Sequence, residues 1–213
     1  MIKLIIFDLD GTLIDSSQDI ANAINHAILG TGLRDVSNEE TIKLIGEGIT
    51  RLIEKLLDPY LLSHSDEALK KFMNYYSSHL VDNTRLYPFV KETLQGLKDF
   101  RKVVLSNKRA SFSTEILERL GVSEYFDAVL GSDTVEEKKP SPKPVNFLLD
   151  KFLVSRDKAV IVGDSDIDIK TGRAAGIRTI GVTYGYRSKE TLHEADLLID
   201  DFRQLEHVIH EML

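Results

Sequence analysis

Short apolar runs alternate with helical stripes along most of the chain, and this alternation predicts a layered α/β domain. The expected strands cover residues 3–7, 102–105, 126–131, 158–163, 178–183 and 196–200. Apolar residues at helical spacing predict helices at residues 89–100, 111–120, 146–152, 167–175 and 202–212. Mostly apolar strands that are separated by helices indicate a Rossmann-like parallel sheet with helices on both faces.

The pattern differs between residues 17 and 82, where helical stripes follow one another without a strand. Ile20, Ile24 and Ile28 mark the first predicted helix, for which Ser16 or Ser17 is the expected N-cap. Three more helices are predicted at residues 38–45, 49–57 and 65–80, and the middle one should end at Asp58-Pro59. We therefore expect a catalytic core of residues 1–16 and 83–213 and an inserted all-helical cap of residues 17–82.

Composition narrows the class of protein. The 213 residues are 42% hydrophobic and carry a formal net charge of −7, so the chain can build a core but lacks the basic surface that nucleic-acid binding requires. It contains no Cys, which excludes disulfides, thiolate zinc sites and thiol nucleophiles. Asp8 and Asp10 interrupt the apolar N-terminus, so we expect no signal peptide, no membrane span and a cytoplasmic enzyme or binding protein.

Two carboxylates, Asp8 and Asp10, directly follow the first predicted strand. Like charges at this spacing repel, so the pair is either a solvated turn or part of a cation site. Polar residues also follow later strands at 106–108 and 163–168, and a lysine-rich loop spans 136–144. Ligands of such sheets bind at the carboxyl ends of the strands, so these groups are expected to share one cleft. Their oxygen atoms suit Mg²⁺.

Four short motifs carry a resemblance to a known family. They are "DLDGT" (8–12), "LSN" (105–107), "KP" (139–140) and "GDSDID" (163–168), and in this order they resemble the four motifs of the haloacid dehalogenase superfamily. Four longer stretches are similar to phosphoglycolate phosphatases. They are "LIGEGITRLIEKLL" (44–57), "GSDTVEEKKPSP" (131–142), "GDSDIDIKTGRAAGI" (163–177) and "GVTYGYR" (181–187).

The resemblance implies a role for each matching acid. Asp8 would attack phosphorus and form an aspartyl-phosphate, while Asp10 would protonate the leaving alcohol and then activate water. Mg²⁺ would bind the carboxylates of Asp8 and Asp164 and the backbone carbonyl of Asp10. Asp168 would orient a metal-bound water or the lysine of the third motif.

The resemblance also implies a phosphate site. Ser106 and the backbone of Asn107 would hold a phosphate oxygen, and Lys139 would pair with the phosphate and the nucleophile. Lys143 also precedes a proline and is the alternative lysine. Lys139 is preferred because the lysine of the family directly precedes Pro-x-Pro, as Lys139 does here.

A loop of the predicted cap resembles the segment that faces the active site in this family. Gly46 and Gly48 flank Glu47, where the family usually has a Gly-Asn-Gly-like loop. Backbone N–H groups at Gly46 to Gly48, or the side chains of Arg51 or Lys55, are the expected donors to a substrate carboxylate. Glu47 must then point away from the substrate or bind a cation.

The predicted function is Mg²⁺-dependent hydrolysis of 2-phosphoglycolate, with a small phosphorylated metabolite as partner. A phosphatase for another small substrate, a pyrophosphatase and a β-phosphoglucomutase-like phosphomutase stay open, because the core motifs specify only phosphoryl transfer. A receiver-type signalling domain is disfavoured by the inserted helices and by Gly11-Thr12 after the acids. Haloacid dehalogenation is disfavoured by Asp10, because that branch lacks the second acid of the first motif. The sequence makes no prediction of the oligomeric state.

Overall fold

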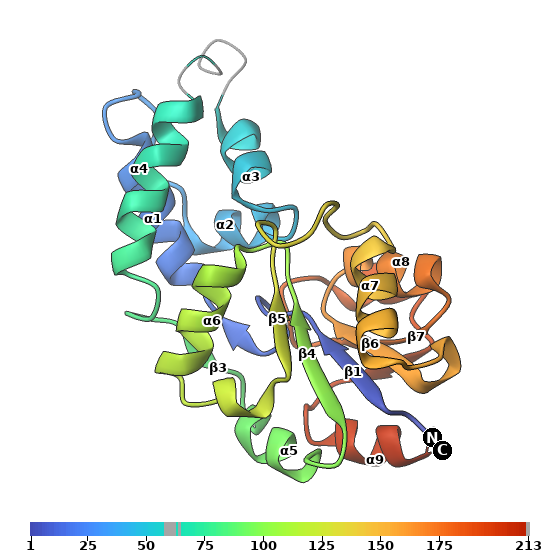
Figure 1. Cartoon of the computed structure of the whole chain (residues 1–213). Helices are drawn as coiled ribbons and strands as arrows, with labels where there is room; N and C mark the ends of the chain where they lie inside the picture. Colours follow the sequence, from blue (N-terminus) through green and yellow to red (C-terminus); the bar gives the residue numbers. More distant parts are fainter. Residues whose placement is uncertain (58–62, 64, 212–213) are drawn as a thin grey trace.

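The centre of the molecule is a six-stranded parallel sheet. The structure, a computed structural model, describes residues 1–57, 63 and 65–211. The strands are β1 (Leu4–Phe7), β4 (Arg101–Leu105), β5 (Ala128–Leu130), β6 (Ala159–Gly163), β7 (Arg178–Val182) and β8 (Leu197–Ile199). Their spatial order is β5-β4-β1-β6-β7-β8, so β1 lies between β4 and β6 (Figure 1). The predicted parallel sheet is confirmed.

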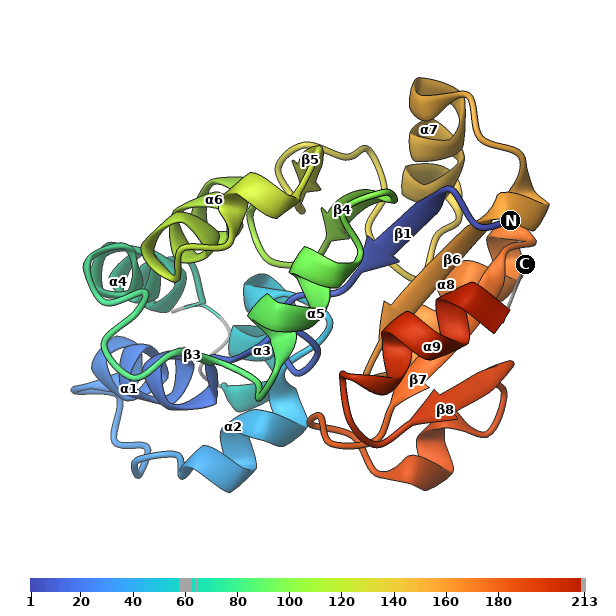
Figure 2. The same ribbon diagram turned by 90° about the horizontal axis from the view of Figure 1, so that it is seen from below.

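Helices cover both faces of this sheet. They are α5 (Val90–Gly96), α6 (Ala110–Arg119), α7 (Lys143–Phe152), α8 (Asp166–Ala175) and α9 (Gln204–Glu211), with 3₁₀ turns η2 (Ser123–Tyr125), η3 (Arg156–Lys158) and η4 (Lys189–Leu192) in the connections. Leu4 and Ile6 of β1 pack in one cluster with residues of α7 and α8. Ile5 and Phe7 point to the other face, where α5, α6 and α9 contribute to the second cluster. Figure 2 views the molecule from the side of α5 and α9. The Rossmann-like fold class is confirmed.

Four helices lie together beyond the carboxyl ends of the strands (Figure 1). They are α1 (Ser17–Ile28), α2 (Asn38–Leu44), α3 (Ile49–Leu56) and α4 (Ser65–Ser78). Ile24 of α1 and Phe72 and Tyr76 of α4 are buried in the same second cluster that covers the Ile5 and Phe7 face of the sheet. Two short antiparallel strands, β2 (Ile14–Asp15) and β3 (Arg85–Leu86), join the helical group to the sheet. The sequence did not predict this pair, because two residues carry no measurable period.

Some predicted boundaries need correction. α7 begins at Lys143 rather than at residue 146, because Pro144 fits the first turn of a helix. Ser16 occupies the N-cap position of α1, but its hydroxyl donates to Asp10 and makes no cap hydrogen bond. The predicted stop at Asp58-Pro59 and the predicted end of the last helix at Met212 fall outside the described residues.

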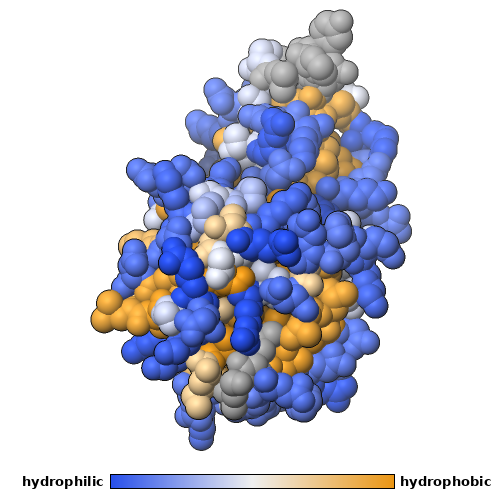
Figure 3. All heavy atoms as spheres, turned by 90° about the vertical axis from the view of Figure 1, so that its right-hand side faces the viewer, coloured by the Kyte–Doolittle hydropathy of each residue, from blue (hydrophilic) through white to orange (hydrophobic). Residues whose placement is uncertain are grey.

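The described helices include none with the length and apolar character needed to cross a bilayer. Figure 3 shows one face of the molecule, on which hydrophilic residues predominate and hydrophobic areas lie between them. Two of the exposed large hydrophobic residues are Phe147 of α7 and Leu153, which directly follows that helix. The apolar residues that the periodicity placed in the core, such as Ile5 and Val160, are fully buried.

Candidate active site

The predicted acids follow two neighbouring strands at the same edge of the sheet. Asp8 and Asp10 come after β1, and Asp164 comes after β6, which pairs with β1 so that Phe7 lies opposite Val162. From β1 the strand order continues in both directions, through β4 on one side and β6 on the other. Such a reversal point opens a crevice at the carboxyl ends of the strands, where α/β sheets bind ligands.

Asp8, Asp164 and Asp168 form a cluster of buried carboxylates. Each offers one oxygen, and these oxygens lie within 4.8 Å of one another. Asp168 is in the first turn of α8, and its Oδ2 accepts a hydrogen bond from the Ser165 hydroxyl at 2.6 Å. This capping box fixes the direction of the Asp168 side chain. The structure therefore brings together three of the four acids that the resemblance places at or beside the metal.

Lys139 reaches this cluster from the loop between β5 and α7. Its Nζ lies 2.8 Å from Oδ1 of Asp8 and 2.6 Å from Oδ1 of Asp168, and its side chain is only 2% exposed. Lys143, the alternative lysine, is 57% exposed and pairs with Glu137 at the surface. Of the two lysines that precede a proline, Lys139 is thus the one beside the predicted nucleophile.

The charges of this cluster do not balance. Burial and the nearby Asp168 raise the pKa of Asp8 to about 7, although Lys139 opposes the rise. Burial, Asp168 and Asp8 also raise the pKa of Asp164 well above its usual range. Three carboxylates with one ammonium form an oxygen-rich, negatively charged set, which fits a hard divalent cation such as Mg²⁺.

Glycines allow the backbone to approach this cluster closely. Gly11 has φ +86°, and a Cβ at this position would lie 2.3 Å from Oδ2 of Asp164. The same carboxylate oxygen accepts a hydrogen bond from the backbone N–H of Tyr186 at 2.7 Å. A side chain at Gly11, the glycine of "DLDGT", would therefore collide with Asp164. Tyr186, to which the sequence assigned no role, helps to hold Asp164.

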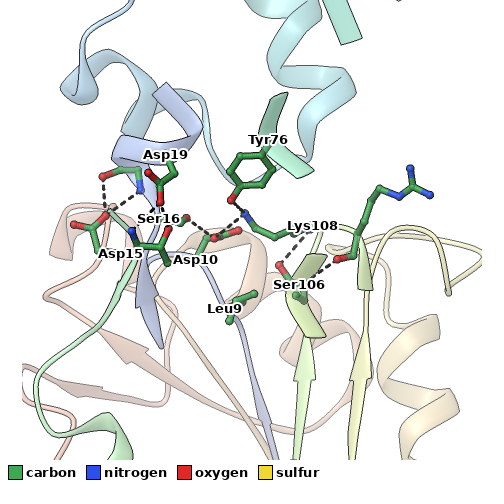
Figure 4. A network of polar contacts seen from close by, with 12 residues as sticks. Leu9, Asp10, Asp15, Ser16, Asp19, Tyr76, Ser106 and Lys108 are labelled. Carbon is green, nitrogen blue, oxygen red and sulfur yellow. Dashed lines mark hydrogen bonds and ion pairs between the residues drawn. The ribbon is translucent and has the colours of Figure 1, made fainter. Parts of the chain in front are cut away.

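The Asp10 carboxylate is not a member of the three-acid cluster and belongs to a second polar network (Figure 4). Its Oδ1 accepts a hydrogen bond from the Ser16 hydroxyl at 2.5 Å and lies 3.1 Å from Nζ of Lys108. Lys108 also donates to the hydroxyl of Tyr76 on α4 at 2.7 Å. Sequence reasoning gave Lys108 and Tyr76 no role; the only signal was that Lys108 directly follows the "LSN" motif. The predicted metal contact of the Asp10 carbonyl stays a prediction.

The second motif and the helical group meet at Asn107. Its side-chain amide donates to the carbonyl of Gly46 at 2.9 Å and to the carbonyl of Lys139 at 3.0 Å. The Ser106 hydroxyl accepts a hydrogen bond from the Lys108 N–H at 3.2 Å. Together with Gly48, the residues Gly46, Ser106 and Asn107 line a cavity of about 70 Å³ that also contains Asp8 and Asp10.

Arg51 and Lys55, two of the predicted donors to a substrate carboxylate, are both paired with acids, and their role toward a substrate stays a prediction. Lys55 pairs with the Glu47 carboxylate at 2.5 Å, and Arg51 pairs with Glu54 at 2.9 Å and with Glu47 at 3.7 Å. Neither cation lines the cavity. The cations and their acidic partners lie three to eight positions apart in the sequence, so Arg51 and Lys55 form local ion pairs. Glu47 binds these cations, as the sequence argument required of it.

Comparison with known proteins agrees with this geometry. Residues 5–182 match the haloacid dehalogenase-like hydrolases. The chain belongs to this family. The hydrolase is 41% identical to a phosphoglycolate phosphatase of Aquifex aeolicus (strain VF5), over 86% of both chains. It is also 37% identical to a phosphoglycolate phosphatase of Vibrio parahaemolyticus, over 98% of this chain and 96% of that one. These similarities confirm the resemblance read from the motifs and make the hydrolase an enzyme of the phosphatase class.

A solved structure extends the likeness to the whole fold. The crystal structure of a predicted phosphoglycolate phosphatase from Haemophilus somnus 129pt superposes on this hydrolase with a TM-score of 0.92. The two are 33% identical, and the match covers 97% of each chain. The hydrolase therefore has the same sheet and the same inserted helices as this relative.

Proposed function

We propose that this hydrolase cleaves 2-phosphoglycolate to glycolate and phosphate through an aspartyl-phosphate on Asp8. The observation that carries the proposal is the placement of Lys139 against Asp8 and Asp168, beside a cavity that also holds Asp10. The nucleophile, its charge partner and a separate acid are thus available to one phosphoryl group.

In the first step, an oxygen of Asp8 attacks phosphorus, and the bond from phosphorus to the ester oxygen breaks. Asp10 gives its proton to the departing oxygen, so glycolate leaves as the alcohol. Lys139 and the polar groups at Ser106 and Asn107 balance the charge on the phosphoryl oxygens. Lys139 is held for this task between two carboxylates at 2.8 and 2.6 Å.

In the second step, Asp10 takes a proton from water while the water oxygen attacks phosphorus. The bond between phosphorus and the Asp8 oxygen breaks, which releases phosphate and restores the Asp8 carboxylate. Asp10 suits this work because its carboxylate is not a member of the three-acid cluster and is oriented by the Ser16 hydroxyl.

Mg²⁺ fits the acidic cluster as the cofactor. Asp8, Asp164 and the carbonyl of Asp10 would hold it, and Asp168 would orient a metal-bound water or Lys139. When bound, the cation neutralises charge on the cluster and on the phosphoryl group. The raised pKa of Asp8 favours its protonated form, which is a poor nucleophile, so a bound cation would help by stabilising the carboxylate.

The four helices act in this proposal as a cap, with domain limits at residues 17–82 for the cap and 1–16 and 83–213 for the core. Gly46 and Gly48 bring the cap to Asn107 and close the cavity over Asp8. This cavity is small, which favours a small substrate over a large one. The names of the relatives point to the same small substrate.

A phosphate-release screen tests this function. We would assay 2-phosphoglycolate, other small phosphomonoesters, hexose phosphates and pyrophosphate with Mg²⁺ and with EDTA, and use Asp8→Asn as the inactive control. We expect phosphoglycolate to have the highest kcat/KM and EDTA to abolish turnover. A clear preference for pyrophosphate, or transfer of the phosphoryl group to a second sugar phosphate, would replace the proposal with the pyrophosphatase or the phosphomutase.

A further inference from the structure

Lys108 is a buried cation at the leaving-group side of the cavity. Its side chain is 8% exposed, and its Nζ lies 3.1 Å from Oδ1 of Asp10 and 2.7 Å from the hydroxyl of Tyr76 (Figure 4). The ammonium also lies 4.8 Å from the centre of the Tyr76 ring. Lys108 comes from the core and Tyr76 from α4, so the two sides of the cavity meet at this ammonium.

The other cations of the cavity are already engaged or exposed. Arg187 donates to the carbonyls of Ile42 and Ile45 at the end of α2. Arg109 is 48% exposed and contacts Asp133 at 3.3 Å. Among the cavity-lining residues that the structure describes, Lys108 is therefore the cation that is both buried and in contact with Asp10.

The surroundings keep Lys108 charged. Burial alone would lower the pKa of its ammonium, but Asp10 and Tyr76 outweigh burial and raise it. An ammonium has three N–H donors, and the contacts with Asp10 and Tyr76 use two of them. Within the described part of the chain no acceptor takes the third, which leaves one donor for a ligand in the cavity.

We propose that Lys108 binds the carboxylate of the leaving group and so selects small phosphoesters that carry a second anionic group. This inference rests on the proposed function and adds a specificity residue to it. Asp10 must touch the ester oxygen in order to protonate it, and in 2-phosphoglycolate a single CH2 carbon separates this oxygen from the carboxylate. A cation in contact with Asp10 lies within reach of this carboxylate, whereas Lys139 lies on the side of Asp8 and Asp168.

The test compares two substrates that differ in the carboxylate. We would measure kcat/KM for 2-phosphoglycolate and for ethyl phosphate with wild-type protein, Lys108→Met and the surface control Lys143→Met. Both substrates should be cleaved more slowly by Lys108→Met, because Asp10 loses a partner. We expect the loss for phosphoglycolate to exceed that for ethyl phosphate by about 100-fold, the scale of a lost charged contact in a closed site. Lys143→Met should leave the ratio unchanged.

Each outcome decides the proposal. Equal losses on the two substrates, which leave their ratio unchanged, would make Lys108 only a positioning residue for Asp10 and would overturn the proposal. If Lys108→Met fails to fold, Lys108→Gln replaces it, because the slightly shorter amide side chain keeps N–H donors and removes the charge. A wild-type protein without preference for phosphoglycolate over ethyl phosphate would instead refute the proposed substrate, which separates that failure from a failure of Lys108.

Discussion

The side-chain amide of Asn107 pairs with both backbone groups of Lys139, much as a neighbouring β-strand would. Its Oδ1 accepts a hydrogen bond from the Lys139 N–H at 3.0 Å, and its Nδ2 donates to the Lys139 carbonyl at 3.0 Å. The same Nδ2 donates to the carbonyl of Gly46 at 2.9 Å. One amide therefore fixes both the lysine beside the nucleophile and the cap loop above it.

Asn107→Asp should lower kcat by about 10- to 100-fold, the range seen when a group that orients an active-site residue is altered. The aspartate has nearly the same shape but presents an acceptor to the carbonyls of Lys139 and Gly46, so both contacts become repulsive. Steady-state kinetics check this, with exposed Asn74→Asp as the matched control. A fully active Asn107→Asp would show that Lys139 is positioned by other contacts.

Lys139→Ala should reduce kcat by about 100- to 1000-fold, as loss of an electrostatic stabiliser does. Lys138→Ala and Lys143→Ala should change it little, because Lys143 is exposed and pairs with Glu137. Kinetics of the three variants with the same substrate decide the matter. The largest loss at Lys143 would contradict the assignment.

Metal-free protein should become less stable as the pH rises toward neutrality because of Asp8. Its folded-state pKa of about 7 lies above the ordinary value of 3.8, so between these values the folded state binds more protons than the unfolded state. The Asp8 contribution to the free energy of unfolding therefore falls as the pH rises through this range.

Urea unfolding in EDTA at several pH values checks this dependence. Asp8→Asn should gain stability relative to wild-type protein toward pH 7, and exposed Asp150→Asn should not. Mg²⁺ should raise the Tm of wild-type protein at neutral pH more than that of Asp8→Asn, because the cation binds the native carboxylates. Identical pH profiles for wild-type protein and Asp8→Asn would contradict the charge imbalance described for this cluster.

Asp19→Asn should lower the free energy of unfolding by about 1–3 kcal/mol, the effect of unpairing buried hydrogen bonds. The Asp19 carboxylate is 1% exposed and accepts from the N–H groups of Asn83 and Thr84 and from the Thr84 hydroxyl, where the chain leaves the helical group. Burial alone would raise its pKa, but the hydrogen bonds of Asn83 and Thr84 lower it instead.

Because the pKa of Asp19 is lowered in the folded protein, the stability that its carboxylate contributes should decrease in acid. The carboxylate stabilises the protein above the ordinary Asp pKa of 3.8, and this stability is lost as the pH falls below that value. Chemical unfolding at pH 7 and at acid pH should therefore show a difference between wild-type protein and Asp19→Asn that shrinks in acid. A constant difference would mean that Asp19 acts by shape alone.

Glu47→Asn should change kcat/KM for phosphoglycolate by tenfold at most, and in the direction of improvement if at all. The Glu47 carboxylate is 46% exposed and is paired with Lys55 and Arg51, so solvent and these cations screen it from the substrate. Measurement of kcat/KM checks this, with Glu54→Gln on the following helix α3 as a control. Inactivity of Glu47→Asn would require a direct role for this carboxylate.

The local pattern of apolar and polar residues was sufficient to predict the parallel sheet and the motifs that follow its strands. Leu4, Ile5, Ile6 and Phe7 are all apolar, and such a strand belongs at the centre of a sheet covered on both faces, which is where β1 lies. Parallel strands present their carboxyl ends at one edge, so Asp8 and Asp164 were expected at the same edge of the sheet once β1 and β6 were predicted, whereas the pairing of β1 with β6 came from the structure. These inferences need only periodicity and strand direction, which are properties of short segments.

Contacts between distant segments were decided by the tertiary structure. Lys139 and Lys143 both precede a proline, and only the path of the loop after β5 places Lys139 on Asp8 and leaves Lys143 in solvent. Lys108, which follows β4, meets Tyr76 of α4, and no spacing in the sequence encodes that approach. The direction of a long cationic side chain depends on which carboxylate and which cap helix lie within its reach, and both come from packing across the whole chain.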